Sequence, residues 1–186
     1  LERVSGVDGG VASGLRGFRC GDAAELIRYT DAGWPEEEAK RCERSFKEAW
    51  LPTIEHYAYF ANGNWETAAL QTKMAIAVFC NDRALFEETV RYAVDGAGNG
   101  SISHMVVYPT GQCQETTRAQ HYTQLGLGLL GNAVEVAWNQ GVNLYGWNNR
   151  RLLAGFEYAA KYGLGEEVPF QHYLDRTGKY GYGGRN

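Results

Sequence analysis

The stretch Gln112–Asn149, QCQETTRAQHYTQLGLGLLGNAVEVAWNQGVNLYGWNN, decides the fold of this chain, because apolar packing and polar chemistry meet in it. From Tyr122 to Trp138 it carries a single charge, Glu135, and apolar side chains occur at every angle of a 3.6-residue period. This pattern predicts a helix that is buried on all sides. Glycines inside the same run cost about 1 kcal/mol each relative to alanine. We therefore expect neighbouring helices to approach this one closely.

Polar residues gather just before the apolar run. Glu115, Arg118 and Tyr122 stand at positions i, i+3 and i+7, so a helix that begins near Glu115 would present them on one face. His121 follows Arg118 by three residues and lies beside the same face. Packing alone does not select such costly groups at the start of a buried helix, which makes them a candidate site. The alternative is an Arg–Glu pair that caps a core helix, and the spacing agrees equally well with it.

The runs QETTRAQHYTQLGLG and EVAWNQGVNLYGWNNRRLLAGFEYAAKYGLG resemble the alginate-lyase-like polysaccharide lyase superfamily, over roughly Asn62 to Val168. In that superfamily, antiparallel helical hairpins form an incomplete α/α toroid, so the resemblance implies a mainly α fold. One departure concerns the proton-transfer residue. The relatives have a Gly-His pair where this chain has His121-Tyr122, so the role of the family histidine falls on either His121 or Tyr122.

The resemblance implies cleavage of a uronic-acid-containing polysaccharide by β-elimination, without a cofactor. The uronate carboxylate is neutralised, a base removes the C5 proton, and an acid protonates the leaving O4. Neutralisation needs neutral or cationic donors, and proton transfer needs a group such as imidazole or phenol. The predicted catalytic residues are Tyr122, His121, Arg118 and Asn64. The predicted substrate-binding residues are Trp65, Gln114, Glu115, Gln124, Tyr145, Trp147 and Arg150.

Two other functions stay open at this stage. Glycoside hydrolases also use α/α toroids and need two opposed carboxylates, for which Glu115 could be combined with Glu66 or Asp82. Nothing in the sequence pairs those carboxylates. A reduced toroid could instead bind carbohydrate without turnover, through the aromatic residues Trp65, Tyr122, Tyr145 and Trp147. The four histidines are scattered without the spacing of metal ligands.

The length and charge of the chain bound its organisation. With 186 residues it is long enough for one domain, over 1–186, but short for a complete toroid. We expect a reduced toroid or a fragment of a longer chain, with another chain or a missing segment completing the ring. The net charge is −4 without a basic stripe, so the expected partner is an acidic polysaccharide met by local arginines, and neither nucleic acid nor membrane. No apolar run reaches the about 18 residues of a membrane span.

Cysteine usage and a sequon suggest the compartment. The four cysteines, Cys20, Cys42, Cys80 and Cys113, are widely spaced and suit two disulfides in one of three pairings. Asn99-Gly100-Ser101 is an N-glycosylation sequon, which predicts a glycoprotein. Both features favour a secreted, extracellular protein.

The helical pattern predicts alternating inner and outer helices at Trp65–Phe79, Asp82–Asp95, Arg118–Trp138 and Asn149–Tyr162. Asn64 is a natural N-cap for the first of these. Its other candidate role is that of the loop asparagine which, by the resemblance, neutralises a uronate carboxylate.

The remaining segments have weaker signals. Residues 1–21 are rich in glycine and are expected to be irregular, before a short helix capped by Asp22. Pro35 and three glutamates predict the start of a further helix. The run Ile102–Tyr108 is β-prone and predicts a small hairpin. The aromatic, glycine-rich tail is expected to wrap over the surface.

Overall fold

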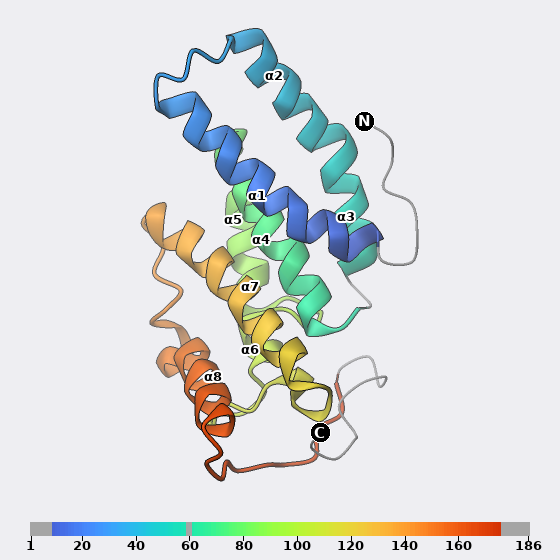
Figure 1. The fold of residues 1–186 in the computed structure, drawn as a ribbon, viewed down its shortest axis with the longest axis vertical. Helices are drawn as coiled ribbons and strands as arrows, with labels where there is room; N and C mark the ends of the chain where they lie inside the picture. Colours follow the sequence, from blue (N-terminus) through green and yellow to red (C-terminus); the bar gives the residue numbers. More distant parts are fainter. Residues whose placement is uncertain (1–8, 59–60, 176–186) are drawn as a thin grey trace.

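The computed structural model describes residues 9–58 and 61–175. In this part of the chain, three long helices are each followed by helices that run back beside them (Figure 1). The hairpins consist of α1 (Gly9–Tyr29) with α2 (Glu36–Ser45) and α3 (Leu51–Ala58), α4 (Gly63–Phe79) with α5 (Arg83–Asp95), and α7 (Gln120–Asn139) with α8 (Trp147–Gly163). The one-turn helix α6 (Ile102–Met105) lies between the second and third hairpins. The predicted fold of antiparallel helical hairpins is confirmed.

The first helix of each hairpin belongs to one row, in which α4 lies between α1 and α7 (Figure 1). Gly14 and Gly21 of α1 lie against Ala68 and Ala75 of α4, in the same order along both helices. The α1 and α4 helices are therefore parallel. This is the arrangement of inner helices in an incomplete α/α toroid.

The α4 and α7 helices are parallel as well. Gly126 of α7 faces Asn64 near the start of α4. About two turns further along both helices, the Asn132 amide donates to Gln71 Oε1 at 2.9 Å. Gly126 is one of the glycines that interrupt the apolar run, and a Cβ there would lie 2.3 Å from Met105 Cε. The expectation of close helix approach is confirmed at Gly126 but not at Gly128, where a Cβ would meet nothing from the described residues within 4 Å. The predicted burial on all sides is wrong, because one face of α7 is exposed and includes Trp138, which is 51% exposed.

The α1 helix corrects the prediction for the N-terminal residues. Instead of an irregular stretch followed by a short helix from Asp22, a continuous helix runs from Gly9 to Tyr29. The glycines form its contact surface with α4: a Cβ added at Gly17 would lie 2.5 Å from Thr72 Cγ2. Because glycine disfavours an isolated helix, close packing on α4 must stabilise this one. Residues 1–8 lie outside the described part.

The predicted β hairpin at Ile102–Tyr108 is wrong. The segment begins with the one-turn helix α6, and within the described residues its β structure is limited to an isolated antiparallel bridge between Val106 and Cys113. Ile102, Met105 and Val106 are all fully buried. Their spacing of i, i+3 and i+4 puts them on one side of a helical turn, whereas a strand would point Ile102 and Met105 to opposite faces. Burial of all three therefore favours the helix.

The helix predicted after Pro35 is present and continues to Ala58. The α2 helix passes through a π-helical turn, Phe46–Trp50, directly into α3. Pro52 stands in the first turn of α3 and lacks an N–H group. A widened turn just before a proline avoids the clash that its ring would make in a regular helix.

The cysteines and the sequon do not behave as predicted. All four cysteines are free thiols, so neither expected disulfide is present. Cys113 is buried in the core between α4, α7 and α8, while Cys42 and Cys80 pack beside a different cluster around Phe46 and Phe79. These thiols serve as small apolar side chains. Burial raises the pKa of Cys80 to about 11, which keeps it protonated.

Asn99 of the sequon is only 1% exposed, and its amide donates to Ala61 O at 3.1 Å and to Asp175 Oδ2 at 2.7 Å. An enclosed asparagine cannot carry a glycan in the folded protein. The two features that favoured a secreted glycoprotein are thus absent or inaccessible. None of the helices in the described part is long and apolar enough to cross a membrane.

The segment Glu166–Asp175, here called the strap, follows α8 along the lower end of the molecule (Figure 1). Gln112 binds it with both ends of its amide, donating to Gln171 O at 2.7 Å and accepting from Gln171 N at 2.8 Å. Tyr158 Oη adds a hydrogen bond to Pro169 O at 2.8 Å. The expectation that the tail wraps over the surface holds for this described part.

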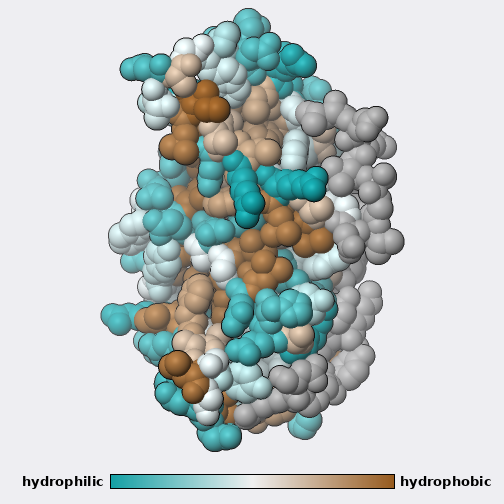
Figure 2. All heavy atoms as spheres, in the orientation of Figure 1, coloured by the Kyte–Doolittle hydropathy of each residue, from teal (hydrophilic) through white to brown (hydrophobic). Residues whose placement is uncertain are grey.

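Apolar side chains are exposed on the surface of the helical hairpins. Figure 2 shows an apolar band across the middle of the row of long helices, with polar surface on both sides. Large exposed apolar residues also lie on α1, at Leu26 and Tyr29, and on the return helix α8, at Leu153 and Phe156. Apolar surface of this kind is typical of positions that neighbouring elements cover.

Candidate active site

The turn before α7 differs from the sequence prediction. Residues Gln114–Thr117 form a 3₁₀ turn, Arg118 is extended with φ −112° and ψ −177°, and α7 begins only at Gln120. Thr116 Oγ1 accepts the Cys113 N–H at 3.0 Å, and Arg118 N–H closes the turn by donating to Glu115 O at 2.9 Å. The helix therefore begins at Gln120 and not near Glu115, because a locally hydrogen-bonded turn precedes it.

The structure nevertheless brings Arg118, His121 and Tyr122 together. The Arg118 guanidinium lies over the Tyr122 ring, with Cζ 4.1 Å from the ring centroid. The His121 and Tyr122 ring centroids are 4.0 Å apart. Tyr122 is half-buried, His121 is exposed, and the Arg118 side chain is 29% exposed. A cation stacked on an aromatic face, beside an imidazole open to solvent, can meet an anionic ligand.

Asn64 adjoins this cluster, although not as an N-cap. The cap residue of α4 is Asn62, whose side chain makes no capping hydrogen bond. Asn64 stands in the first turn and is only 2% exposed. Its backbone N–H donates to Glu115 Oε1 at 3.0 Å, and Glu115 Oε2 accepts from Arg118 Nη1 at 2.9 Å. One carboxylate therefore joins Asn64 to Arg118.

Glu115 and Gln114, both predicted to bind substrate, are enclosed. Glu115 is 0% exposed and Gln114 is 1% exposed. Gln114 Oε1 accepts the Gly63 N–H at 2.9 Å, so these two neighbours together hold the first turn of α4. Burial raises the pKa of Glu115, opposed by the hydrogen bond from Asn64 and by the Arg118 charge.

The other predicted substrate-binding residues are dispersed. Gln124 is exposed on the next turn of α7, and Trp65 is half-buried at the start of α4. Tyr145 Oη donates to Glu135 at 2.6 Å, which places it about 20 Å of helix rise from Tyr122. Trp147 and Arg150 follow Tyr145 at the start of α8. These three lie apart from the Arg118 cluster.

A hollow opens beside Arg118, between the start of α7 and the second half of α8. Its empty volume is about 380 Å³, including the open mouth, and its lining comprises Thr116, Arg118, Gln120, Thr123, Tyr158, Ala159 and Tyr162. Tyr158 and Tyr162 were missed at the level of sequence. Their i, i+4 spacing on α8 indicates a shared face, but only the packing of α8 on α7 directs that face towards Arg118.

A wider hollow, of about 760 Å³, lies at the opposite end of α4 and α7. It is lined by surface residues such as Asp82, Arg83 and Glu87, and it contains none of the predicted site residues. We place the candidate site at the smaller hollow, because the cationic and aromatic groups converge there.

The carboxylates proposed for glycoside hydrolysis do not form a catalytic pair. Asp82 caps α5 by accepting the Leu85 N–H at 3.0 Å, at the other end of α4 from Glu115. The length of α4 separates them by about 25 Å, whereas hydrolytic carboxylates stand within about 10 Å. Glu66 is 1% exposed and accepts hydrogen bonds from Tyr92 Oη and Gly100 N–H. Its carboxylate is thereby committed to the protein itself.

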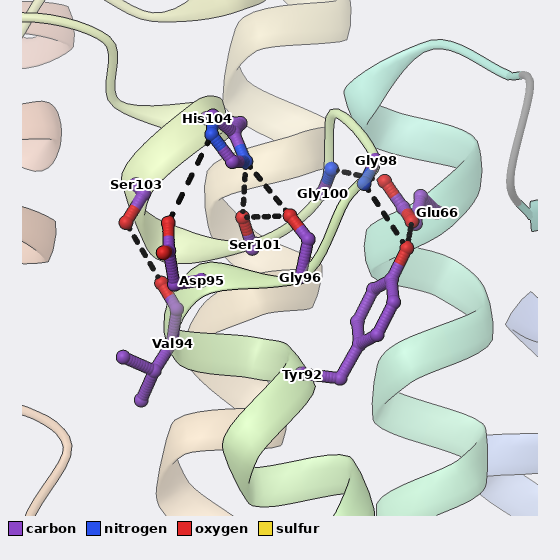
Figure 3. Close-up of polar contacts among 10 residues, drawn as sticks. All are labelled: Glu66, Tyr92, Val94, Asp95, Gly96, Gly98, Gly100, Ser101, Ser103 and His104. Atoms are coloured by element: carbon purple, nitrogen blue, oxygen red, sulfur yellow. Dashed lines mark hydrogen bonds and ion pairs between the residues drawn. The ribbon is translucent and has the colours of Figure 1, made fainter.

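Figure 3 shows how Glu66 holds the loop after α5. Tyr92 Oη, bound to Glu66, also accepts the Gly98 N–H at 3.1 Å. On the other side of the loop, His104 Nδ1 lies 2.8 Å from Gly96 O and from Ser101 Oγ. A Cβ at Gly98 would meet the Glu66 carboxylate, so only glycine permits this approach. The loop in turn carries Asn99, which contacts Ala61 before α4.

A family model described as alginate lyase matches residues 1–170. The chain therefore belongs to the alginate lyase family, a family of polysaccharide lyases. No curated protein and no solved structure matches it. The matched range includes Arg118, His121, Tyr122 and the two α8 tyrosines of the hollow.

Proposed function

We propose that this protein is a polysaccharide lyase that cleaves a uronic-acid-containing polysaccharide by β-elimination. The observation that carries the proposal is the partly exposed Arg118 guanidinium, which lines the hollow between α7 and α8 and stacks on Tyr122, whose ring contacts His121. Membership of the alginate lyase family supports an acidic polysaccharide as substrate.

Arg118 is proposed to hold the uronate carboxylate. A guanidinium has five N–H donors, of which the Glu115 contact engages Nη1, so further donors remain for a second carboxylate. Removal of the C5 proton moves negative charge onto that carboxylate as the enediolate develops. A fixed cation at this point lowers the barrier, since stabilisation of developing charge is usually the largest catalytic effect.

Tyr122 is proposed as the group that contacts the transferred proton, with His121 beside it. Arg118 lies over the Tyr122 ring, so a uronate bound to Arg118 has its C5 close to Tyr122. His121 is in ring contact with Tyr122 and open to solvent, which suits it to exchange protons with water. Together the two side chains supply the base and acid that β-elimination needs.

Asn64 is proposed to accept a hydrogen bond from the bound sugar. Its Oδ1 is buried and has no hydrogen-bond partner among the described residues. Buried polar atoms are nearly always paired, so an unpaired acceptor next to the candidate site suggests a ligand group that completes it. A hydroxyl of the bound sugar has the required donor.

The test is turnover across a panel of uronate polysaccharides, followed by the ultraviolet absorbance of the unsaturated product. We expect absorbance to rise with at least one polymer, and to rise about 10²-fold to 10³-fold more slowly in the Arg118→Ala variant. A binding protein would show affinity for the polymer with no absorbance, and a hydrolase would release reducing ends with no absorbance. Either result would refute the proposed reaction.

We also propose that the protein acts outside the cell, where acidic polysaccharides occur. The support comes from the family, because the free thiols and the enclosed Asn99 give none. Fractionation of the source cells, with immunodetection of the protein in medium and lysate, tests this location. Detection confined to the lysate would contradict it.

A further inference from the structure

The first turn of α4 is capped by side chains from a distant part of the chain. The Gly63 N–H donates to Gln114 and the Asn64 N–H donates to Glu115, in each case across 51 positions of sequence. Helix N-termini are normally capped by the side chain of the preceding residue, here Asn62, which makes no such bond. The capping function has therefore moved to the 3₁₀ turn before α7.

Glu115 does more than cap α4, because its second oxygen binds Arg118. The carboxylate is 0% exposed, so solvent does not screen this contact as it would on the surface. Arg118 faces it from its own turn, Cys113 lies near it, and the Asn64 N–H faces it from α4. A buried carboxylate shared between a cation and a backbone donor has a restricted geometry.

We propose that Glu115 is a positioning residue, whose carboxylate fixes the Arg118 guanidinium relative to the first turn of α4. The inference rests on the proposed function, in which Arg118 holds the uronate. Arg118 is an extended residue before α7 and stacks on Tyr122 of that helix, while Asn64 belongs to the preceding hairpin. Glu115 is the contact that sets the separation of these two groups.

The Glu115→Gln variant tests the inference with little change in shape. The amide oxygen still accepts the Asn64 N–H, but the amide nitrogen then faces the Arg118 donors and the ion pair is lost. Loss of a charge-assisted hydrogen bond predicts a fall in kcat/KM of about 10-fold to 100-fold, expressed as a higher KM and a lower kcat, because Arg118 holds the carboxylate both in the bound substrate and in the enediolate. The matched control is Glu88→Gln, which removes an exposed carboxylate paired with Lys73 at 3.2 Å and should leave kcat/KM unchanged.

The double variant Glu115→Gln/Arg118→Ala separates positioning from general support of the fold. If Glu115 acts through Arg118, the double variant has the same kcat/KM as Arg118→Ala alone. If Glu115 only supports the fold, its effect multiplies that of Arg118→Ala. A multiplied effect, or an unchanged KM in Glu115→Gln, overturns the inference.

One measurement tests the contact without any substrate. In ¹⁵N relaxation, the Arg118 side chain should be ordered in the native protein and mobile in Glu115→Gln, with no such change in Glu88→Gln. Equal mobility of Arg118 in the native protein and in Glu115→Gln overturns the inference whatever the activity. Absence of turnover with an ordered, Glu115-dependent Arg118 would instead count against the proposed function alone.

Discussion

The two ends of α4 are built differently. At the N-terminal end, Gly63 and Asn64 are held by buried polar side chains, and within the described residues the amide atoms Asn62 Oδ1, Asn64 Oδ1 and Gln114 Nε2 are buried without partners. At the C-terminal end, Phe79 packs edge-on against Phe46 with centroids 5.5 Å apart. Among the described residues, unpaired buried polar atoms also occur near the aromatic end, at Glu25 Oε2 and Ser45 Oγ. What distinguishes the N-terminal end is that buried side chains from the turn before α7 hold the first turn of α4, beside the candidate site. The aromatic end contributes stability.

The largest expected effect is at the polar end, in Tyr122→Phe. Loss of a proton-transfer group lowers rates by about 10²–10⁴. Because the ring remains, stacking with Arg118 is preserved, and we expect kcat to fall while the melting temperature stays near that of the native protein. Steady-state kinetics and thermal unfolding of the same preparation measure both.

His121→Ala identifies the partner of Tyr122. A loss as large as that of Tyr122→Phe means that both side chains transfer protons during turnover. If kcat and affinity stay at native values in both variants, the cluster is only the polar cap of a buried helix. The N-terminal end of α4 would then have no role in turnover.

At the aromatic end, Phe79→Ala should lower the stability of the protein and leave its catalytic rate unchanged. Truncation of a buried phenylalanine typically costs about 3–5 kcal/mol, and Phe79 is 1% exposed. Denaturant unfolding measures the loss, with Tyr29→Ala as the control, because the Tyr29 side chain on α1 is 73% exposed. We expect the folded fraction of Phe79→Ala to retain native kcat. A large fall in kcat without loss of stability would show that this end also takes part in turnover.

A smaller effect is expected from Glu66, through pH. Burial raises the pKa of Glu66 above its ordinary value of 4.5, despite the opposing hydrogen bonds from Tyr92 and Gly100. The folded state then binds the proton more tightly than the unfolded state. The resulting stability is fully present below the unfolded pKa and is lost as pH rises through the folded pKa.

The free energy of unfolding of the native protein, relative to Glu66→Gln, should therefore decrease as pH rises from 4.5. Chemical unfolding of both proteins over a pH series gives this difference directly and cancels Glu115, whose pKa is raised in the same direction. A difference that grows with pH would contradict the prediction.

The smallest effect is expected from Tyr145→Phe. The sequence pattern grouped Tyr145 with the substrate-binding residues, but its hydroxyl binds Glu135 and its ring contacts Trp138, far from Arg118. We expect KM and kcat to stay within error of the native values. A raised KM for long polymers, with short substrates unaffected, would mean that the substrate extends along α7 to this point.

Helix prediction succeeded where the signal was local. The expected helices at Trp65–Phe79 and Asp82–Asp95 agree closely with α4 (Gly63–Phe79) and α5 (Arg83–Asp95). Their apolar periods and the Asp82 cap act within a few residues of chain. The α1 helix was missed for the opposite reason. Glycines such as Gly14 and Gly17 disfavour a helix locally and are tolerated only because α4 lies against them.

At the candidate site, too, the sequence indicated the local arrangement but not the long-range contacts. Nearness of Arg118, His121 and Tyr122 follows from their short separation in sequence, and it survived although the helix begins later than expected. The spacing of Glu115 and Gln114 did not indicate that both side chains turn inward to α4, and their roles in substrate binding stay predictions. No local pattern reports which distant backbone groups a side chain will meet.

By itself, the sequence of this protein determined its helical class, its alternation of long and return helices, and the identity of the cationic and aromatic groups before α7. These properties depend on spacing and side-chain chemistry over a few turns. Tertiary structure alone decided that α1 is a helix, that α6 replaces a strand, that the thiols are free, and that Glu115 joins Asn64 to Arg118. Each depends on contacts between residues far apart in the chain, whose energies exceed local preference only once the hairpins have packed together.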